Sequence, residues 1–199
     1  MGSDVSGGRA AIVASAVRNF NEVGYHATSI RDIARGAQVT TAAIYHHFAS
    51  KHEILTEIMV AALRDSIAST RRAALAAGGA PDAQLHAVVR AWVMFHTTRQ
   101  PDARVGASEL RSLEPAGRSL VVALRDEQED LFHDIVERGV ASGEFVVEYP
   151  RDATRGIINM GQSVCGWWRS DGPLTPEQLA ARYADFALVL MQHTPKAHY

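Results

Sequence analysis

The sequence predicts an all-α protein of about nine helices. Apolar residues recur at spacings of three and four along most of the 199 residues, and Gly, Pro and Ser residues separate the helical stretches. No stretch alternates apolar and polar residues beside a turn partner, and the strand-like segment 143–149 has nothing to pair with, so we predict a loop there. Apolar residues make up 47% of the chain, which is enough to build a core.

The first 50 residues predict three short helices joined by tight turns. Residues 9–23 form an amphipathic helix that ends at Gly24, and Thr28 is expected to cap a second helix that ends at Gly36. Thr40 is expected to cap a third, short helix. Since a few residues join the second and third helices and the first helix braces them, the layout is that of a helix-turn-helix.

The remaining chain predicts longer helices. Ser50 and Glu53 form a capping box that begins a helix running to about residue 77. Further helices are predicted at about 82–99, 101–113, 116–142 and 151–170, and Thr175 with Gln178 opens a last one. The chain therefore divides into an N-terminal tail with a helix-turn-helix domain, residues 1–50, and a larger helical domain, residues 51–199.

Composition limits the class of protein and its compartment. The single cysteine, Cys165, cannot form an internal disulfide, which suits a reducing cytosol, and no apolar run approaches the ~20 residues that span a bilayer. The N-terminal MGSDVSGG lacks the layout of a signal peptide, and we interpret it as a flexible tail. The net charge is −2, yet residues 1–52 hold five Lys and Arg against three acids. We expect a cytoplasmic protein whose N-terminal part is compatible with phosphate binding.

The short stretch TTAAIYHHF, which begins at Thr40, has the composition of a helix that reads DNA. The first residues of such a helix meet base edges in the major groove. Thr40 and Thr41 offer hydroxyls to a base or a phosphate, and Ala42 is small enough to contact thymine methyl groups. Tyr45 and His46 lie near the end of the stretch, where a phenol or an imidazole can donate to a phosphate.

The start of the second predicted helix offers a phosphate site, because its free backbone N–H groups and its dipole favour an anion. Thr28, Ser29 and Arg31 lie there, and Lys51 adds a positive charge at the start of the fourth helix. The predicted DNA-binding residues are therefore Thr28, Ser29, Arg31, Thr40, Thr41, Ala42, Tyr45, His46 and Lys51.

The same residues have alternative interpretations, namely a core helix with incidental histidines and a metal site. The side chains of adjacent histidines on a helix point ~100° apart, so they do not converge on one metal ion. His26, His46, His47 and His52 lack the spacing of a zinc site, so no metal is predicted. The chain shows no nucleophile elbow, Gly-rich phosphate loop or paired-carboxylate helix motif, so we predict no enzyme, no catalytic residue and no cofactor. Whether His47 faces DNA or packs against a neighbouring helix stays open.

The stretches F..VGY.ATSIRDIA, VTTAAIYHHF and SKHEIL occur in this order, and their spacing from Gly24 to Lys51 agrees with a known family without insertion. On these stretches, residues 10–54 resemble the N-terminal module of TetR-type (tetracycline-repressor-like) transcriptional regulators. The resemblance covers about a quarter of the chain. One departure is Gln38, at a turn position where the family more often has Gly.

The resemblance implies a homodimeric repressor that binds a palindromic operator and is released when a small molecule enters the C-terminal domain. It makes residues 51–199 the ligand-binding and dimerisation domain, with the last two helices as the dimer interface. Gly156 and Gly161 permit the close approach of another helix there. The implied partners are double-stranded operator DNA, a small-molecule effector and a second copy of the chain, with no membrane.

An apolar pocket with a few polar groups is the usual form of a small-molecule site. The stretch CGWWRSDGPLTPEQLAARY distantly resembles regulators of lipid and steroid breakdown that sense acyl-CoA thioesters, so we expect a mostly apolar effector, acyl-CoA-like or otherwise derived from a lipid. Each aromatic residue also fits a core position, and a helical adaptor or a small-molecule-binding protein without DNA is the alternative function. The predicted ligand-binding residues are Trp92, Phe95, His96, Arg104, Phe132, Met160, Cys165 and Trp168.

Overall fold

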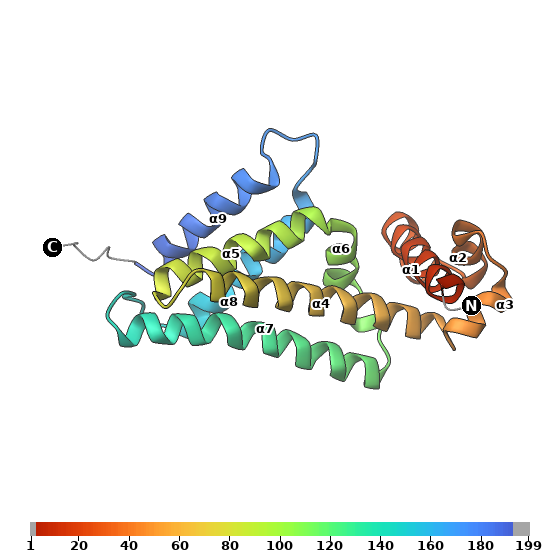
Figure 1. Cartoon of the computed structure of the whole chain (residues 1–199), viewed down its shortest axis with the longest axis horizontal. Helices are drawn as coiled ribbons and strands as arrows, with labels where there is room; N and C mark the ends of the chain where they lie inside the picture. Colours follow the sequence, from red (N-terminus) through yellow and green to blue (C-terminus); the bar gives the residue numbers. More distant parts are fainter. Residues whose placement is uncertain (1–2, 193–199) are drawn as a thin grey trace. The chain divides into compact units, whose positions relative to one another are not determined.

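Helices make up the regular structure of this protein (Figure 1). The computed structural model describes residues 3–192. In chain order its elements are α1 (Ser3–Val23), α2 (Ile30–Ala37), α3 (Thr41–His47), α4 (Lys51–Ala76), α5 (Pro81–Thr98), α6 (Gln100–Ser108), a 3-10 helix η1 (Leu110–Ser112), α7 (Pro115–Ala141), α8 (Pro150–Trp167) and α9 (Pro176–Leu190).

The predicted fold class is confirmed. Residues 3–192 contain nine α-helices and no strand, and segment 143–149 is a loop as predicted. Among these residues no helix is both long enough and apolar enough to cross a membrane.

Three predicted caps are confirmed. Gly24 ends α1 with a left-handed backbone (φ 85°), which a residue without a Cβ adopts at little cost. The Thr40 hydroxyl accepts a hydrogen bond from the Ala43 N–H at 3.1 Å and so caps α3. Thr175 and Gln178 form the reciprocal capping box of α9.

The predicted ends of α2, a cap at Thr28 and an end at Gly36, are wrong by one residue and by two residues respectively. Its N-cap is Ser29 rather than Thr28: the Ser29 hydroxyl accepts from the Asp32 N–H (3.2 Å), and the Asp32 carboxylate accepts from the Ser29 N–H (3.0 Å). This box satisfies two otherwise unpaired backbone donors. Gly36 lies inside the helix, and Gln38 closes it in the left-handed conformation (φ 58°).

The N-terminal helix is longer than predicted. α1 begins at Ser3, so residues 3–8 extend the helix and the flexible tail expected there is wrong. Adding a turn to an existing helix needs no new nucleus, which favours the extension. The first two residues of that predicted tail lie outside the described residues.

The helix predicted at 101–113 is too long at its C-terminal end. α6 stops at Ser108 and η1 follows, with Leu113 extended after it. α7 begins at Pro115, and the residue before a proline disfavours helical geometry, so the chain leaves the helix before that point.

The described chain forms two compact units. The first contains residues 3–63 and 101–123, and the second contains residues 64–100 and 124–192. The long helices α4 and α7 each contribute to both units, and the domain boundary predicted at residue 50 stays a prediction.

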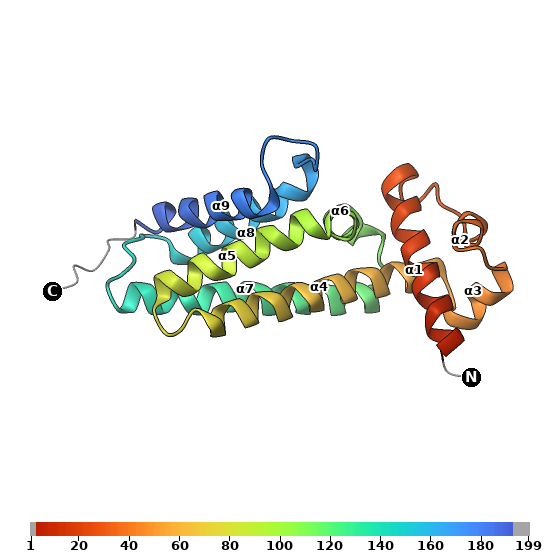
Figure 2. The ribbon, with the colours of Figure 1, turned by 45° about the horizontal axis from the view of Figure 1, so that its top comes forward.

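In the first unit, α1 packs against α2 and α3 (Figure 2). α1 and α2 approach closely because Gly36 has no side chain: a Cβ there would lie 2.4 Å from the Ser15 Oγ. The Ser15 hydroxyl donates to the Ile33 carbonyl at 2.9 Å across the same contact. The buried apolar side chains of the three helices are Ile12, Ala16, Val17, Phe20, Ile33, Ala34 and Ile44.

In the second unit, α5 packs against α8 and α9 (Figures 1 and 2). Gly161 on α8 makes room for the ring of Trp92, since a Cβ at this position would lie 2.3 Å from the indole. The Trp92 indole N–H then donates to the Ile158 carbonyl at 3.0 Å. The core of the unit includes Leu85, Val88, Val89, Trp92, Phe132, Ile135, Ile157, Val164, Leu179 and Ala184.

A glycine in α7 provides a test of this packing. A Cβ on Gly139 would lie 2.1 Å from the ring of Phe145, which is buried in the loop after α7. We expect Gly139→Ala to lower the free energy of unfolding by about 1–3 kcal/mol in urea unfolding followed by circular dichroism, because the ring must move. The control is Gly106→Ala in α6, where nothing lies within 4 Å of the added Cβ and the gain in helix propensity dominates. Equal losses in the two variants would contradict the role of the Phe145 contact.

Candidate functional site

The helix α3 and its C-cap residue turn two apolar side chains inward, and four positions of the helix lie outside. Ile44 and Phe48 are buried in the first unit. Thr41, Ala42 and His46 are exposed. The predicted reading residues therefore face solvent on one short helix, where a DNA groove is accessible to them.

Tyr45 is the large exposed side chain of this surface, at 58% of its full accessibility. Its ring contributes little to the core, so burial does not explain its position. A phenol held outside a helix near its C-terminal end is able to donate to a phosphate oxygen.

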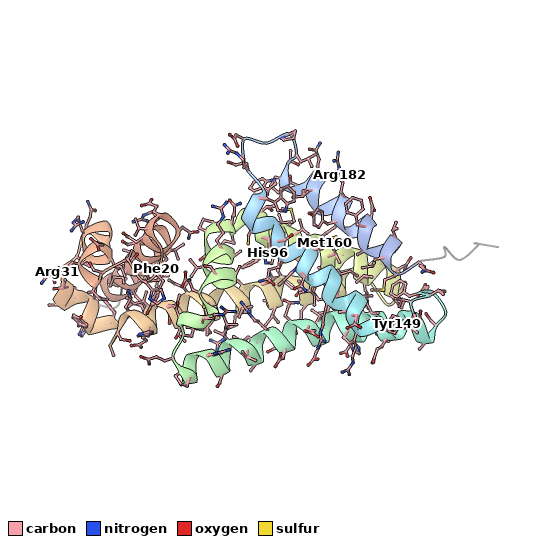
Figure 3. All side chains as sticks on the ribbon, turned by 180° about the vertical axis from the view of Figure 1, so that it is seen from behind. Phe20, Arg31, His96, Tyr149, Met160 and Arg182 are labelled. Atoms are coloured by element: carbon pink, nitrogen blue, oxygen red, sulfur yellow. The ribbon has the colours of Figure 1, made fainter. Side chains whose placement is uncertain are left out.

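The start of α2 forms a second polar edge of the same module. Ser29 and Arg31 are exposed, and Figure 3 shows Arg31 at the outer surface while Phe20 lies inside. Hydrogen bonds from the Ser29 hydroxyl and N–H, together with Arg35, hold the pKa of Asp32 below its usual range. Beside this paired carboxylate, the Arg31 guanidinium is an exposed cation at the start of α2.

Thr28 and Lys51, also predicted to bind DNA, point into the module. Thr28 is only 2% exposed, and its hydroxyl donates to the Gly24 carbonyl at 2.8 Å. The Lys51 ammonium donates to the carbonyls of Tyr25 (2.8 Å) and Thr28 (2.7 Å), and burial lowers its pKa. Both side chains stabilise the loop before α2, and a contact of either with DNA stays a prediction.

His47 lies against α1, which answers the question that the sequence left open. A Cβ added to Gly8 of α1 would lie 3.3 Å from the His47 Nε2. The His47 carbonyl also accepts a hydrogen bond from the Arg9 guanidinium at 2.9 Å.

Arg9 is a residue that the sequence analysis missed. Its guanidinium makes two hydrogen bonds to the Glu57 carboxylate of α4 (3.0 and 2.7 Å) and lies 4.2 Å from the centre of the Phe48 ring. The pairing with Glu57 raises the pKa of Arg9. No local pattern predicts this contact, because the two residues are 48 positions apart.

The remaining histidines of the module make hydrogen bonds within the first unit. Ser112 Oγ lies 3.2 Å from His26 Nε2, and the Tyr25 hydroxyl lies 3.0 Å from His52 Nδ1. Burial, with Glu114 and then Glu109 nearby, raises the pKa of Tyr25 to about 12, so its hydroxyl stays protonated. In the described part of the chain, no three His, Cys, Asp or Glu side chains are placed to hold a metal ion.

Four of the predicted ligand-binding residues lie together in the second unit. The ring of Trp92 is 4.3 Å from that of His96 and 6.0 Å from that of Phe132, and His96 is 5.4 Å from Phe95. Trp92, His96 and Phe132 are buried. These rings form an apolar cluster with one imidazole in it.

The other four predicted residues are placed differently. The carbonyls of Cys165 and Trp168 accept hydrogen bonds from the Gln100 side-chain amide (3.0 and 2.7 Å), and both side chains are buried. Met160 is half-buried on α8, which Figure 3 shows with its label. Arg104 is exposed and belongs to the first unit. Ligand binding by all eight residues stays a prediction.

His96 is neutral inside this cluster. Its Nδ1 lies 2.8 Å from the Trp92 carbonyl, which can only accept, so Nδ1 carries the proton and Nε2 is left as an acceptor. Burial lowers the pKa of His96 to about 4, and the hydrogen bond to the carbonyl only partly opposes this shift.

The exposed face of α3, its buried anchors and the bracing helix α1 define a helix-turn-helix DNA-binding protein. Residues 12–58 match the bacterial regulatory proteins of the tetR family, and residues 78–191 match the tetracyclin repressor-like C-terminal domain. The chain belongs to the TetR family of DNA-binding transcriptional repressors, which are not enzymes.

Similar proteins include a transcriptional repressor and two solved structures. The transcriptional repressor KstR2 of Mycobacterium tuberculosis is 29% identical over 203 residues, which cover 94% of this chain and 92% of KstR2. A tetR-family regulatory protein from Rhodococcus RHA1 is 30% identical, with a TM-score of 0.89 over 94% of this chain and 98% of that one. PfmR from Thermus thermophilus is 32% identical, with a TM-score of 0.82 over 93% and 99% of the two chains.

The burial of His96 predicts a loss of stability in acid. Above pH 6.5 the imidazole is neutral in both the folded and the unfolded chain, so it contributes no pH dependence. As the pH falls from 6.5 to about 4, only the unfolded chain takes up this proton, so the free energy of unfolding falls. The loss attributable to His96 reaches about 3 kcal/mol.

We expect this contribution to disappear in His96→Gln. Urea unfolding of both proteins between pH 7 and pH 4 gives the two slopes of the free energy of unfolding against pH. Parallel slopes for the wild type and the variant would contradict the neutral state of His96.

Proposed function

We propose that this protein is a ligand-responsive repressor that binds a palindromic operator as a homodimer. A small, mostly apolar effector releases it from DNA. The observation that carries the proposal is the surface of α3, where Thr41, Ala42, Tyr45 and His46 face solvent while Ile44 is buried. As a DNA-binding regulator it acts in the cytoplasm.

Exposed apolar side chains on α8 and α9 support the homodimer. Trp167, Phe186 and Leu190 are about half exposed, and Val189 is 75% exposed. The rings of Trp167 and Phe186 flank that of Tyr183, at 6.5 and 5.9 Å. A contiguous exposed apolar surface is typical of a protein interface, and a twofold dimer matches a palindromic site.

The effector is proposed from the apolar cluster in the second unit and from similar proteins. KstR2 of Mycobacterium tuberculosis, described as a ketosteroid transcriptional regulator, is 27% identical to this chain with a TM-score of 0.83. AibR shares the fold at 22% identity and was crystallised with isovaleryl coenzyme A and operator DNA. A lipid-derived molecule, including acyl-CoA-like thioesters, is therefore the first effector class to test.

The placement of the reading helix is tested by Thr41→Ala and His46→Ala. Each removes an exposed polar group, so we expect operator affinity to fall at least about tenfold with a nearly unchanged melting temperature. Gel-shift assays on the DNA upstream of the gene measure the affinity. The control is Arg72→Ala, which removes an exposed charge from α4. Full affinity in both α3 variants would refute this placement.

Salt titration of the same assay separates the repressor from the alternative helical adaptor. Phosphate contacts release counterions, so we expect the logarithm of the affinity to fall linearly with the logarithm of salt concentration. A protein that fails to bind its upstream DNA even at low salt would be the adaptor instead.

The dimer is tested by Phe186→Asp on α9. The side chain is half exposed in the single chain, so we expect the variant to fold but to sediment as a monomer in analytical ultracentrifugation. Operator affinity should fall with it, because one chain covers only half of a palindrome. Leu75→Asp is the matched control, since Leu75 is exposed on α4. A dimeric Phe186→Asp protein would place the interface elsewhere.

A further inference from the structure

Several uncharged polar side chains are buried in the second unit, and four of them carry the argument. Ser66 and Thr70 come from α4, His96 comes from α5, and Gln128 comes from α7. Each is at most 4% exposed. Polar groups at such positions need hydrogen-bond partners, since an unmade bond costs the desolvation of the group.

The four side chains lie within about one helical turn of one another along the three helices. α4 and α7 run in the same direction there, and α5 runs in the opposite direction (Figure 1). The Thr70 hydroxyl lies 3.1 Å from the Gln128 Nε2, which puts these two at one level. The ring of Trp92 on α5 faces that of Phe132 on α7. His96 lies one turn after Trp92 along α5, and Gln128 lies one turn before Phe132 along α7. Because α5 and α7 are antiparallel, His96 and Gln128 come to the same level.

Ser66 joins this layer from α4. It lies one turn before Thr70, and its neighbour Asp65 pairs with Arg99 at 3.1 Å. Arg99 in turn lies one turn beyond His96. We call Ser66, Thr70, His96 and Gln128 the neutral polar layer.

The neutral polar layer has hydrogen-bonding capacity that the described residues do not use. The Ser66 hydroxyl is buried without a partner among them. The Gln128 amide, which offers two N–H donors and a carbonyl acceptor, meets only the Thr70 hydroxyl there. Since Nδ1 of His96 faces the Trp92 carbonyl, its Nε2 is an acceptor directed away from the backbone of its own helix.

The charges near the layer are outside it. Asp65 and Arg99 form an exposed pair, and Arg71 pairs with Glu127 at 2.9 Å, also at the surface. Arg125 precedes Gln128 by three residues on α7 and is half-buried. An ion in the layer would therefore lose its hydration with no fully buried charge beside it, which costs far more than burying a neutral group.

We propose that the neutral polar layer binds the uncharged polar group of the effector, a hydroxyl or a carbonyl on an apolar skeleton. Ser66 and Gln128 supply donors, and His96 Nε2 supplies an acceptor. The rings of Trp92 and Phe132 beside the layer contact the apolar skeleton. A carboxylate or an ammonium group on the same skeleton is rejected. This inference rests on the proposed function, because it assigns the effector class of the same repressor.

Three probes with one skeleton test the proposal: decanol, decanoate and decylamine, each titrated calorimetrically into the full-length protein. We expect decanol to bind at least about tenfold more tightly than either ion, the cost of leaving one buried charge without a partner. Decanoate binding as tightly as decanol would assign an anion site beside Arg125 and would overturn the proposal. No binding of decanol up to its solubility limit would also overturn it.

Ser66→Ala separates a binding role from a structural one. Removing a hydroxyl that has no partner should leave the melting temperature unchanged or higher, while decanol affinity falls about tenfold. The matched control is Thr154→Ala, whose buried hydroxyl already donates to the Pro150 carbonyl at 2.8 Å. That variant should melt lower and keep its decanol affinity. Unchanged decanol affinity in Ser66→Ala would overturn the proposal.

Gln128→Met gives a second readout if the serine variant fails to fold, since it keeps the volume of the side chain and removes its amide. It should lower decanol affinity as well, and wild-type affinity in this variant counts against the proposal. Operator binding of each ligand-free protein is measured in parallel. If the wild type binds its operator but does not prefer decanol to the two ions, the neutral polar layer alone is refuted. If the wild type does not bind its operator, the proposed function is refuted.

Discussion

The orientation of α3 depends on the burial of Ile44 and Phe48. A helix of seven residues does not hold its shape in water by itself, because too few backbone hydrogen bonds offset the cost of nucleation. Burying two large apolar side chains contributes roughly 3–6 kcal/mol. The Thr40 cap adds about 1 kcal/mol. Once these side chains are inside, Thr41, Ala42, Tyr45 and His46 face solvent, so the proposed DNA-reading surface follows from the packing of a small core.

Arg9 ties this core to the rest of the first unit. Both Arg9 and Glu57 are more than a third exposed, so their attraction is screened and contributes little free energy by itself. The two parallel hydrogen bonds nevertheless fix the direction of the guanidinium, which places it over the Phe48 ring and against the His47 carbonyl. One side chain thereby holds α1, the end of α3 and the start of α4 in a single arrangement.

Between α4, α5 and α7, the second unit buries uncharged polar groups and leaves its ion pairs at the surface. Its ion pairs, such as Arg71 with Glu127 and Arg155 with Glu129, lie at the surface, whereas the buried hydroxyls and the Gln128 amide between α4, α5 and α7 carry no charge. The same desolvation that keeps His96 neutral makes an ionic ligand group costly there. The chemistry of the proposed effector site thus follows from burial, just as the proposed reading surface of α3 does.

The sequence by itself determined the helices, the caps at Gly24 and Thr40 and the helix-turn-helix, because each rests on residues a few positions apart. It also predicted the exposed face of α3, since helical spacing separates that face from the apolar positions. Only the tertiary structure decided the pairing of Arg9 with Glu57 and the packing of His47 against α1. It also brought the neutral polar layer together from three helices. These contacts join residues far apart in the chain, and no local period encodes which helix faces meet.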